Sequence, residues 1–307
     1  MNSKTKIWVA LIALYIVWGS TYLGIKFAIE TIPPFFHAAV RFLISGTILV
    51  VWQKSAGLPM PTRKQWISSA IVGTMLLLGG NGLVAWAEQF IPSGIAALII
   101  GSSPMFLVMA EAIRPGGVKP NWQAIVGILI GFVGIFILVG PSNISGSTTK
   151  LNPLGVIALL CACLLWASGS IFSKNADMPK SSLMSTGAQM LAGSVSLMIM
   201  SLLTGELSKW DPSGVSMHSI YGLLYLIFVG SLVGFVSYGW LLQNAPISLV
   251  ATYAYVNPIV AVILGSLFAA EKLEPHIWLA TAIIIGSVIF INGKSKPKVR
   301  SEAKAQV

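Results

Sequence analysis

The sequence predicts an all-α membrane protein whose ten transmembrane helices form two inverted five-helix repeats. Three observations support this prediction: an apolar composition, ten apolar runs of membrane-spanning length, and one sequence pattern that occurs twice. Hydrophobic residues make up 55% of the 307 residues and charged residues 9%, against roughly 25% charged residues in soluble domains. So few charges suffice for membrane loops but not for the surface of a soluble domain of this size.

The ten apolar runs match the roughly 17–25 helical residues needed to cross a hydrocarbon core of about 30 Å. They cover residues 7–29, 34–53, 66–88, 92–112, 122–140, 153–174, 182–203, 219–242, 247–269 and 276–293. The first run is longer than the apolar region of a signal peptide, so we interpret it as a mature helix. The connections are short, and we expect no separate soluble domain.

The repeated pattern runs from Trp18 to Lys26 and returns 148 residues later from Trp166 to Lys174. Each copy leads from tryptophan through small residues to lysine. Four later landmarks recur 154 or 155 residues on: Pro92 as Pro246, Pro104 as Pro258, Pro120 as Pro275 and Gly131 as Gly286. A half-length repeat is typical of membrane transporters, whose substrate site lies between the halves. We therefore expect repeats at residues 1–145 and 146–293, followed by a basic cytoplasmic tail at residues 294–307.

The distribution of Lys and Arg predicts the orientation, because short loops rich in these residues stay in the cytoplasm. If the N-terminus is inside, the inner segments hold Lys4, Lys6, Lys54, Arg63, Lys64, Arg114, Lys119, Lys174, Lys180, Lys294, Lys296, Lys298, Arg300 and Lys304. The outer connections hold only Lys150, Lys209 and Lys272. Both termini are therefore predicted in the cytoplasm, and five spans per half invert the second repeat relative to the first.

The net charge of +10 raises the question of nucleic acid. The basic residues are spread over loops and termini without an aromatic-studded patch, so a lipid bilayer is the expected partner instead. Cys161 and Cys163 point away from each other on a helix and are interpreted as small apolar residues. We expect no metal and no cofactor, and a chain that is either a monomer or a homodimer.

These features together resemble the EamA family of the drug/metabolite transporter superfamily. The resemblance rests on the paired Trp-to-Lys segments, the segments around Pro104 and Pro258, and the turn Ala270-Glu271-Lys272-Leu273 before the last span. It covers roughly residues 7–293. The first half departs from the pattern, with Glu111 and Arg114 in the corresponding turn. The resemblance implies a bacterial inner-membrane protein that exports small metabolites by alternating access, with a cavity between the halves.

The candidate substrate-binding residues are polar or aromatic groups on the spans of both halves. They are Trp18, Tyr22, Asn81, Trp86, Ser102, Trp166, Tyr238, Tyr253 and Asn257. Tyr253 and Asn257 share a helix face beside Pro258, where an aromatic wall and an amide would meet one ligand. Asn81 follows two glycines and is either a cavity group or an interhelical hydrogen-bond donor. Such a lining favours amphipathic or aromatic metabolites, including amino acids, although Trp and Tyr also form interfacial belts and fill helix contacts.

The candidate gate or coupling residues are charged groups predicted near the outer ends of the spans. Lys26 and Arg41 either snorkel to the headgroups or pack at the helix ends, or they act in an outer gate or attract an anionic group. A salt bridge from Glu30 or Glu88 to one of these cations is one form of that gate. Glu88 is alternatively a proton-coupling carboxylate.

Two other functional classes are weighed from the same residues. An intramembrane enzyme needs a nucleophile with a base or a set of metal ligands, and His37, His218 and His276 form no such motif. A channel needs a filter segment or a charged ring, which the sequence does not show. A lipid-moving protein stays open as an alternative. No phosphate-binding loop is present, so coupling to an ion gradient or facilitated diffusion is expected.

Overall fold

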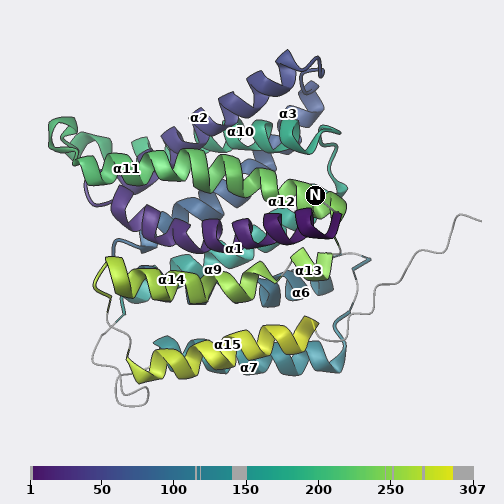
Figure 1. Cartoon of the computed structure of the whole chain (residues 1–307), viewed down its shortest axis with the longest axis vertical. Helices are drawn as coiled ribbons and strands as arrows, with labels where there is room; N and C mark the ends of the chain where they lie inside the picture. The colour runs from purple at the N-terminus through teal and green to yellow at the C-terminus, as the bar shows by residue number, and fades with distance from the viewer. Residues whose placement is uncertain are drawn as a thin grey trace, which may run out of the picture.

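The computed structural model describes residues 3–114, 116–117, 119–139, 151–245, 247–250, 252–271 and 274–292. Within these ranges the chain is helical and has no strand, which confirms the predicted all-α class. Most helices lie side by side with roughly common axes (Figure 1). α1 begins, and α15 ends, on the same side of the molecule, at the right of Figure 1.

The helices follow the predicted apolar runs to within a few residues. The first half contains α1 (Ser3–Ala28), α2 (Pro34–Ser55), α3 (Arg63–Gly73), the π-helix η1 (Thr74–Gly82), α4 (Leu83–Ala87), α5 (Ser93–Ile100), α6 (Ser103–Ile113) and α7 (Trp122–Val139). The second half contains α9 (Pro153–Asn175), α10 (Ser182–Leu203), the 3-10 turns η2 (Leu207–Lys209) and η3 (Pro212–Gly214), α11 (Met217–Tyr225), the π-helix η4 (Leu226–Val233), α12 (Gly234–Asn244), α13 (Ile247–Val250), α14 (Tyr253–Phe268) and α15 (Pro275–Asn292).

Seven helical segments in the described residues are long and apolar enough to cross a membrane. They are Lys4–Ala28, Pro34–Ser55, Arg63–Ala87, Ser93–Ile113, Pro153–Asn175, Ser182–Leu203 and Met217–Tyr238. Three shorter apolar helices cover Trp122–Leu138, Val256–Phe268 and Pro275–Phe290. The chain is therefore a multi-pass helical membrane protein by length and composition, and the number of ten crossings stays a prediction.

Local signals explain where the helices begin. Thr62 and Gln65 form a capping box, in which each side chain accepts a hydrogen bond from the other residue's backbone N–H. Ser181 and Ser216 cap α10 and α11 by accepting from backbone N–H groups in the first turn. Proline occupies the first turn of α2, α6 and α9, where its missing N–H costs no helical hydrogen bond.

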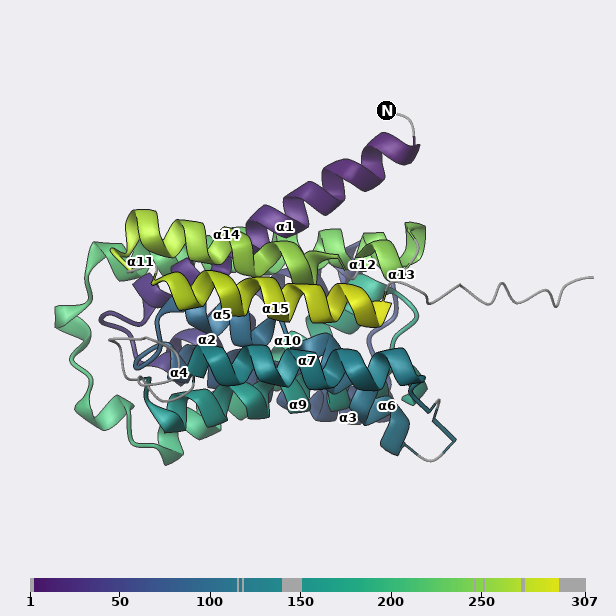
Figure 2. The same ribbon diagram turned by 90° about the horizontal axis from the view of Figure 1, so that it is seen from below.

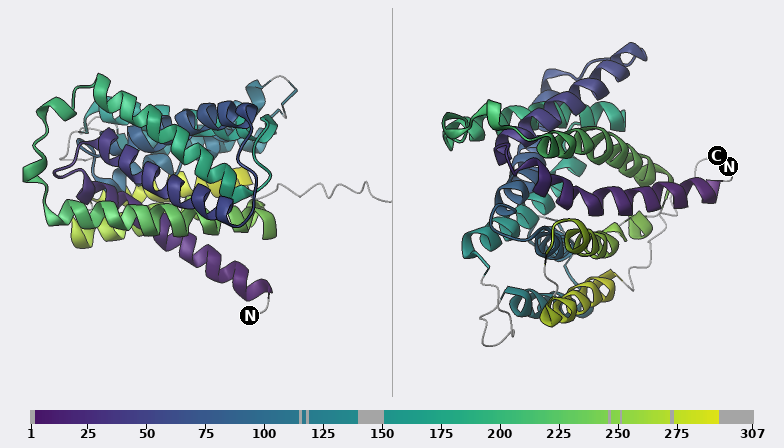
Figure 3. Two further views of the ribbon diagram at one scale, coloured as in Figure 1. Left: turned by 90° about the horizontal axis from the view of Figure 1, so that it is seen from above. Right: turned by 60° about the vertical axis from the view of Figure 1, so that its left-hand side comes forward.

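The main helix contacts join the two halves of the chain. α2 packs along α10, α7 along α15, and α1 along α14, while α9 packs against η1, α4 and α6. α7 and α15 lie side by side at the front of Figure 2. The two views in Figure 3 show the same interleaving of early and late segments. Since each half packs mainly on the other, most of the interior lies between the halves.

The third helical segment of each half contains a π-helix, η1 in the first and η4 in the second. η1 includes Gly79, Gly80, Asn81 and Gly82, and three glycines in four positions weaken a regular helix. A π-helix has one additional residue in its turn and is frequent at functional sites.

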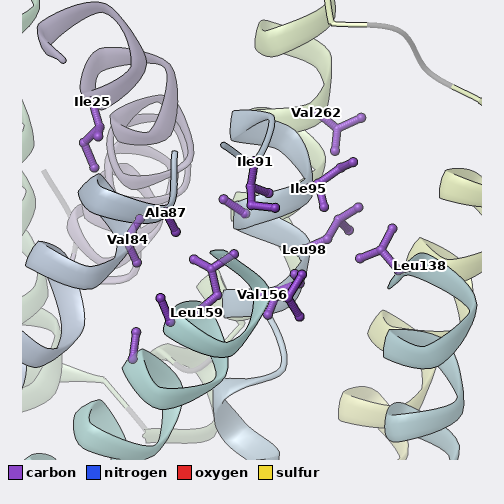
Figure 4. Close-up of a cluster of buried hydrophobic side chains, with 14 of the residues drawn as sticks. Ile25, Val84, Ala87, Ile91, Ile95, Leu98, Leu138, Val156, Leu159 and Val262 are labelled. Carbon is purple, nitrogen blue, oxygen red and sulfur yellow. The ribbon is translucent and has the colours of Figure 1, made fainter. Parts of the chain in front are cut away.

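The largest buried apolar cluster also draws on both halves. Labelled in Figure 4 are Ile25, Val84, Ala87, Ile91, Ile95, Leu98, Leu138, Val156, Leu159 and Val262. Many large apolar side chains point outward instead, including Trp122, Leu129 and Phe136 of α7 and Leu279 of α15. An apolar exterior suits a chain whose solvent is lipid. Cys163 is buried, Cys161 is exposed, and both thiols are free.

Candidate substrate-binding site

Trp18 lies at the centre of a group of four aromatic rings. Its ring centroid is 5.3 Å from that of Phe235 and 5.0 Å from that of Tyr238, both in α12. Tyr253, at the start of α14, is 5.2 Å from Trp18 and 5.9 Å from Tyr238. We call Trp18, Phe235, Tyr238 and Tyr253 the aromatic cluster. It joins α1 of the first half to α12 and α14 of the second, and it contains three predicted site residues.

Asn257 lies beside the aromatic cluster and is 7% exposed. With its NH2 group directed at the backbone, the amide nitrogen is 3.2 Å from the carbonyl oxygens of Tyr253 and Tyr15. The hydroxyls of Tyr15 and Thr252 share a further hydrogen bond between α1 and the residue that precedes α14. These bonds hold α1 against α14. The Asn257 amide, which we expected to bind a ligand, is therefore hydrogen-bonded to the backbone in this conformation.

The two repeated tryptophans make equivalent contacts with glycine across the halves. The indole of Trp18 lies against Gly234, at the start of α12. The indole of Trp166 lies against Gly80 in η1, where a Cβ would come 2.7 Å from the ring. Each tryptophan thus packs on the third helical segment of the opposite half. Within the described residues, no ring contact joins Trp166 to the aromatic cluster.

The other predicted substrate-binding residues do not converge on the aromatic cluster. Asn81 donates from its amide nitrogen to the Leu76 carbonyl, 3.4 Å away in the same π-helix, and so makes a local bond rather than an interhelical one. Ser102 is fully buried and donates to the carbonyl of Ile99 at 2.6 Å. Tyr22 and Trp86 pack on the apolar cluster of Figure 4, and Trp86 meets the ring of Phe90 at 5.2 Å.

Pro104 and Pro258 occupy different positions in their helices. Pro104 is in the first turn of α6, after the helix is interrupted at Gly101 and Ser102. Pro258, in contrast, is inside α14. The ring of Pro258 packs on Gly101, where a Cβ would lie 2.7 Å from its Cγ. The break between α5 and α6 therefore receives the proline of α14, which a side chain at position 101 would obstruct.

Arg41 is buried in α2, with 2% exposure, and does not reach out to the headgroups. Its Nε donates to the hydroxyl of Ser231 in η4 at 2.8 Å, and its Cζ lies 4.7 Å from the ring centroid of Phe42. The snorkelling interpretation of Arg41 is wrong for this conformation, because its face of α2 packs on η4 rather than on lipid.

The predicted gate salt bridges are absent from the described residues. Lys26 donates to the backbone carbonyl of Glu88 at 3.2 Å, not to its carboxylate. Glu88 directly follows the apolar segment Arg63–Ala87 and is fully buried, and neither carboxylate oxygen has a hydrogen-bond partner in the described chain. Glu30 pairs with His218, with 2.8 Å between Oε2 and Nδ1. The start of α11, which sequence spacing does not place near Glu30, supplies its partner.

Glu271 provides an inter-half contact that explains the acidic turn before the last helix. Its carboxylate accepts from the backbone N–H of Ser93 at 2.6 Å and of Gly94 at 3.0 Å, and from the Ser93 hydroxyl at 2.8 Å. It thereby satisfies the N-terminus of α5. Ala270, with φ of 51°, turns the chain at this point. Glu111 instead pairs with Arg114 of its own half at 2.6 Å, so the two acidic residues have different structural roles.

A second carboxylate performs a similar function on α2. Glu206, after α10, accepts from the backbone N–H of Phe36 at 2.7 Å and of Phe35 at 3.4 Å. Trp210 follows it, donating from Nε1 to the carbonyl of Thr31 at 2.8 Å and packing its ring 5.0 Å from that of Phe36. The connection between α10 and α11 is thus fixed to the connection between α1 and α2.

Sequence reasoning missed three residues near the candidate site: Phe235, Tyr15 and Ser231. Phe235 is three residues before Tyr238, a helical spacing that places both on one face, so this signal was available. Tyr15 is three residues before Trp18 in the same way. Ser231 had no sequence signal, because its relevance comes only from its contact with Arg41.

An all-helical chain with an apolar exterior and an interior shared by two halves belongs to the class of multi-pass membrane proteins. A model of the EamA-like transporter family matches residues 5–140 and 153–293. The chain belongs to this family, which confirms the resemblance stated from its motifs.

Relatives and a solved structure extend over most of the chain. The uncharacterized inner membrane transporter YedA of Escherichia coli K12 is 38% identical over 283 residues, covering 92% of this chain and 89% of that protein. The uncharacterized transporter YvbV of Bacillus subtilis is 24% identical over 298 residues, covering 95% and 93%. One crystal structure aligns with a TM-score of 0.62 at 16% identity, covering 93% of this chain and 96% of that one, and shows a shared fold. The chain is a transporter-family protein of the inner membrane.

Proposed function

We propose that the protein is a secondary transporter that exports small amphipathic organic metabolites, amino acids or related compounds, by alternating access. The ten helical segments cross the membrane as two inverted five-helix repeats, residues 1–145 and 146–293. Both termini and the basic tail lie in the cytoplasm. The substrate moves between the halves, through the region that α1, α9 and their partners in the opposite half enclose.

The paired tryptophan contacts carry this proposal. Trp18 of the first half packs on Gly234 of the second, and Trp166 of the second half packs on Gly80 of the first. Each half therefore supplies one tryptophan and one glycine to the same type of contact. A π-helix in the third segment of each half follows the same correspondence. Two related halves that pack on each other by equivalent contacts are suited to exchange one packing for its counterpart, which is the motion that alternating access needs.

The aromatic cluster supplies the central part of the proposed substrate site. Its rings offer an apolar wall with two phenolic hydroxyls, suited to a ligand that is partly apolar and partly polar. Five other predicted residues make local or core contacts in this conformation, and they would contact the substrate in other conformations of the cycle. They are Trp166, Asn81, Trp86, Tyr22 and Ser102. Asn257 would contact the substrate once its hydrogen bond to the Tyr15 carbonyl of α1 is broken.

Glu88 is the proposed coupling group. A fully buried carboxylate without a hydrogen-bond partner in the described chain is costly when ionised, so proton binding favours burial. Lys26 lies next to Glu88 and donates to its backbone carbonyl at 3.2 Å. Movement that exposes Glu88 would release the proton, and this would link the gradient to the exchange of conformations.

Transport by proteoliposomes tests the proposed function. The purified chain is reconstituted and given radiolabelled amino acids and related metabolites, with and without an imposed pH gradient. Saturable movement of one substrate class, lost in Trp18→Ala and kept in the exposed loop variant Ser213→Ala, supports transport through the halves. Movement that is linear and equal in both variants contradicts it. Loss of gradient dependence in Glu88→Gln, with passive exchange retained, is the expected signature of coupling.

A further inference from the structure

We propose that Arg41, with His37 one turn before it, forms a buried anion site that receives the carboxylate of an aromatic or otherwise apolar monoanion. The inference rests on the proposed function and deepens it by naming the substrate class. It depends on three observations within the described residues: a buried guanidinium without an acidic partner, a buried imidazole whose ring nitrogens lack a side-chain hydrogen-bond partner, and a short connection from Arg41 to the aromatic cluster.

The Arg41 guanidinium is only partly satisfied by its surroundings. Of its five N–H donors, the one on Nε is used by Ser231. In the described chain, the two terminal nitrogens have no hydrogen-bond partner and no carboxylate lies within 4.0 Å. The ring of Phe42 offers a cation–π contact at 4.7 Å, which does not neutralise the charge. Because a buried unpaired charge is costly, this site favours an anion that completes the pair.

His37 adds donor capacity on the same face of α2. It is 1% exposed, and no side chain among the described residues forms a hydrogen bond with either ring nitrogen; the nearest backbone acceptor is the carbonyl of Pro34 in the preceding turn. Residues 37, 41 and 45 follow one another at intervals of four, so they share one face of the helix. Ser45 on this face donates to the carbonyl of Ile227 at 3.3 Å, which shows that the face meets η4.

The anion site adjoins the aromatic cluster through one glycine. A Cβ built on Gly230 would lie 3.3 Å from the Nη2 of Arg41 and 3.0 Å from the Cγ2 of Thr21. Thr21 in turn donates to the carbonyl of Trp18 at 2.6 Å. On the opposite side, Phe235 of the aromatic cluster follows Ser231 by four residues along the same helical segment. Ser231, which binds Arg41, and Phe235 of the aromatic cluster are therefore about one helical turn apart along this segment.

This arrangement identifies the ligand by its chemistry. The planar guanidinium fork matches a carboxylate, and four rings beside it match an apolar body. A single arginine balances one negative charge, so a monoanion fits better than a phosphate ester. A cationic amine with the same apolar body would meet Arg41 as a like charge and is disfavoured.

Binding of three isosteric probes to the purified full-length protein tests the site. Phenylacetate, 2-phenylethylamine and 2-phenylethanol share the ring and differ in charge. We expect phenylacetate to bind saturably and at least tenfold more tightly than the other two. Arg41→Gln should weaken phenylacetate binding tenfold or more, while Arg63→Gln, which removes an exposed arginine at the start of α3, should leave it unchanged. Equal binding of amine and acid, or unchanged binding in folded Arg41→Gln, would overturn the proposal.

A second variant keeps the test decisive when Arg41→Gln does not fold. Arg41→Lys retains the charge and loses the planar fork, and we expect phenylacetate binding several-fold weaker than in the wild type. Wild-type affinity in folded Arg41→Lys contradicts the anion site. Transport separates the two proposals: if a neutral or cationic solute is transported and Arg41→Gln keeps that transport, the anion site fails and the transporter stands. If phenylacetate binds through Arg41 but no solute moves, the transporter fails and the anion site stands.

Discussion

Gly80 lies beneath the indole of Trp166, so close that a Cβ on this glycine would come within 2.7 Å of the ring. Gly234 and Trp18 form the equivalent contact between the halves. Both contacts depend on a glycine in or next to a π-helix. The backbone of the third segment can approach the tryptophan this closely only because no side chain intervenes.

Gly80→Ala is therefore expected to lower both stability and transport. The added methyl group must displace a large, fixed ring, and such overpacking costs roughly 1–3 kcal/mol. Thermal unfolding in detergent measures the loss of stability. Gly286→Ala is the matched control, because nothing lies within 4 Å of a Cβ at that helical glycine. Equal melting temperatures for the two variants would contradict the contact.

Glu271→Gln is expected to destabilise the chain by disrupting the cap of α5. Replacing the carboxylate weakens charge-assisted bonds from Ser93 and Gly94, which together contribute about 1–3 kcal/mol. The thermal midpoint reports the change. Glu111→Gln should cost less, because the Glu111–Arg114 pair is about one-third exposed and lies within one half. A larger loss in Glu111→Gln than in Glu271→Gln would show that the capping role is overstated.

Trp210→Phe isolates one hydrogen bond in the connection between α10 and α11. The substitution keeps a ring to pack on Phe36 and removes the Nε1 bond to the carbonyl of Thr31. We expect a loss of about 1 kcal/mol in unfolding free energy, and a larger loss in Trp210→Ala. Trp122→Phe, at a 67% exposed site, serves as the control and should stay near the wild type. If Trp210→Phe matches Trp210→Ala, the hydrogen bond rather than the ring accounts for the whole effect.

Thiol labelling checks the predicted orientation. In a chain without Cys161 and Cys163, we expect Ser208→Cys to react with a membrane-impermeant maleimide in cells whose outer membrane is permeable. Lys180→Cys should react only after the inner membrane is opened. Both residues are exposed in the structure, so access depends on the side of the membrane. The reverse labelling pattern would place both termini outside and invert the orientation.

The helical segments were predictable because each depends on local sequence. The apolar runs at residues 34–53, 66–88, 153–174 and 182–203 gave ranges that the structure reproduces within a few residues. The interruption of the fourth segment into α5 and α6 was not predicted in that form. A proline beside Ser102 and Ser103 indicates a bend, whereas the break at Gly101 also depends on Pro258 from the other half.

The site was predicted in part for the same reason. Trp18, Tyr238 and Tyr253 were identified as polar aromatic residues on separate segments, and packing brings them together. The partners of charged residues could not be read from spacing. Arg41 meets Ser231, Glu30 meets His218, and Lys26 meets a backbone carbonyl.

The sequence by itself determined the membrane class, the helical segments and the family, because composition, apolar length and motif order act over short stretches of chain. The tertiary structure alone decided which faces meet: the capping of α5 by Glu271, the burial of Glu88 and the position of Arg41 beside the aromatic cluster. The contacts of Glu271 with Ser93 and of Arg41 with Ser231 join residues more than a hundred positions apart. Burial of a charge is settled by the helices that surround it, and no local pattern encodes that arrangement.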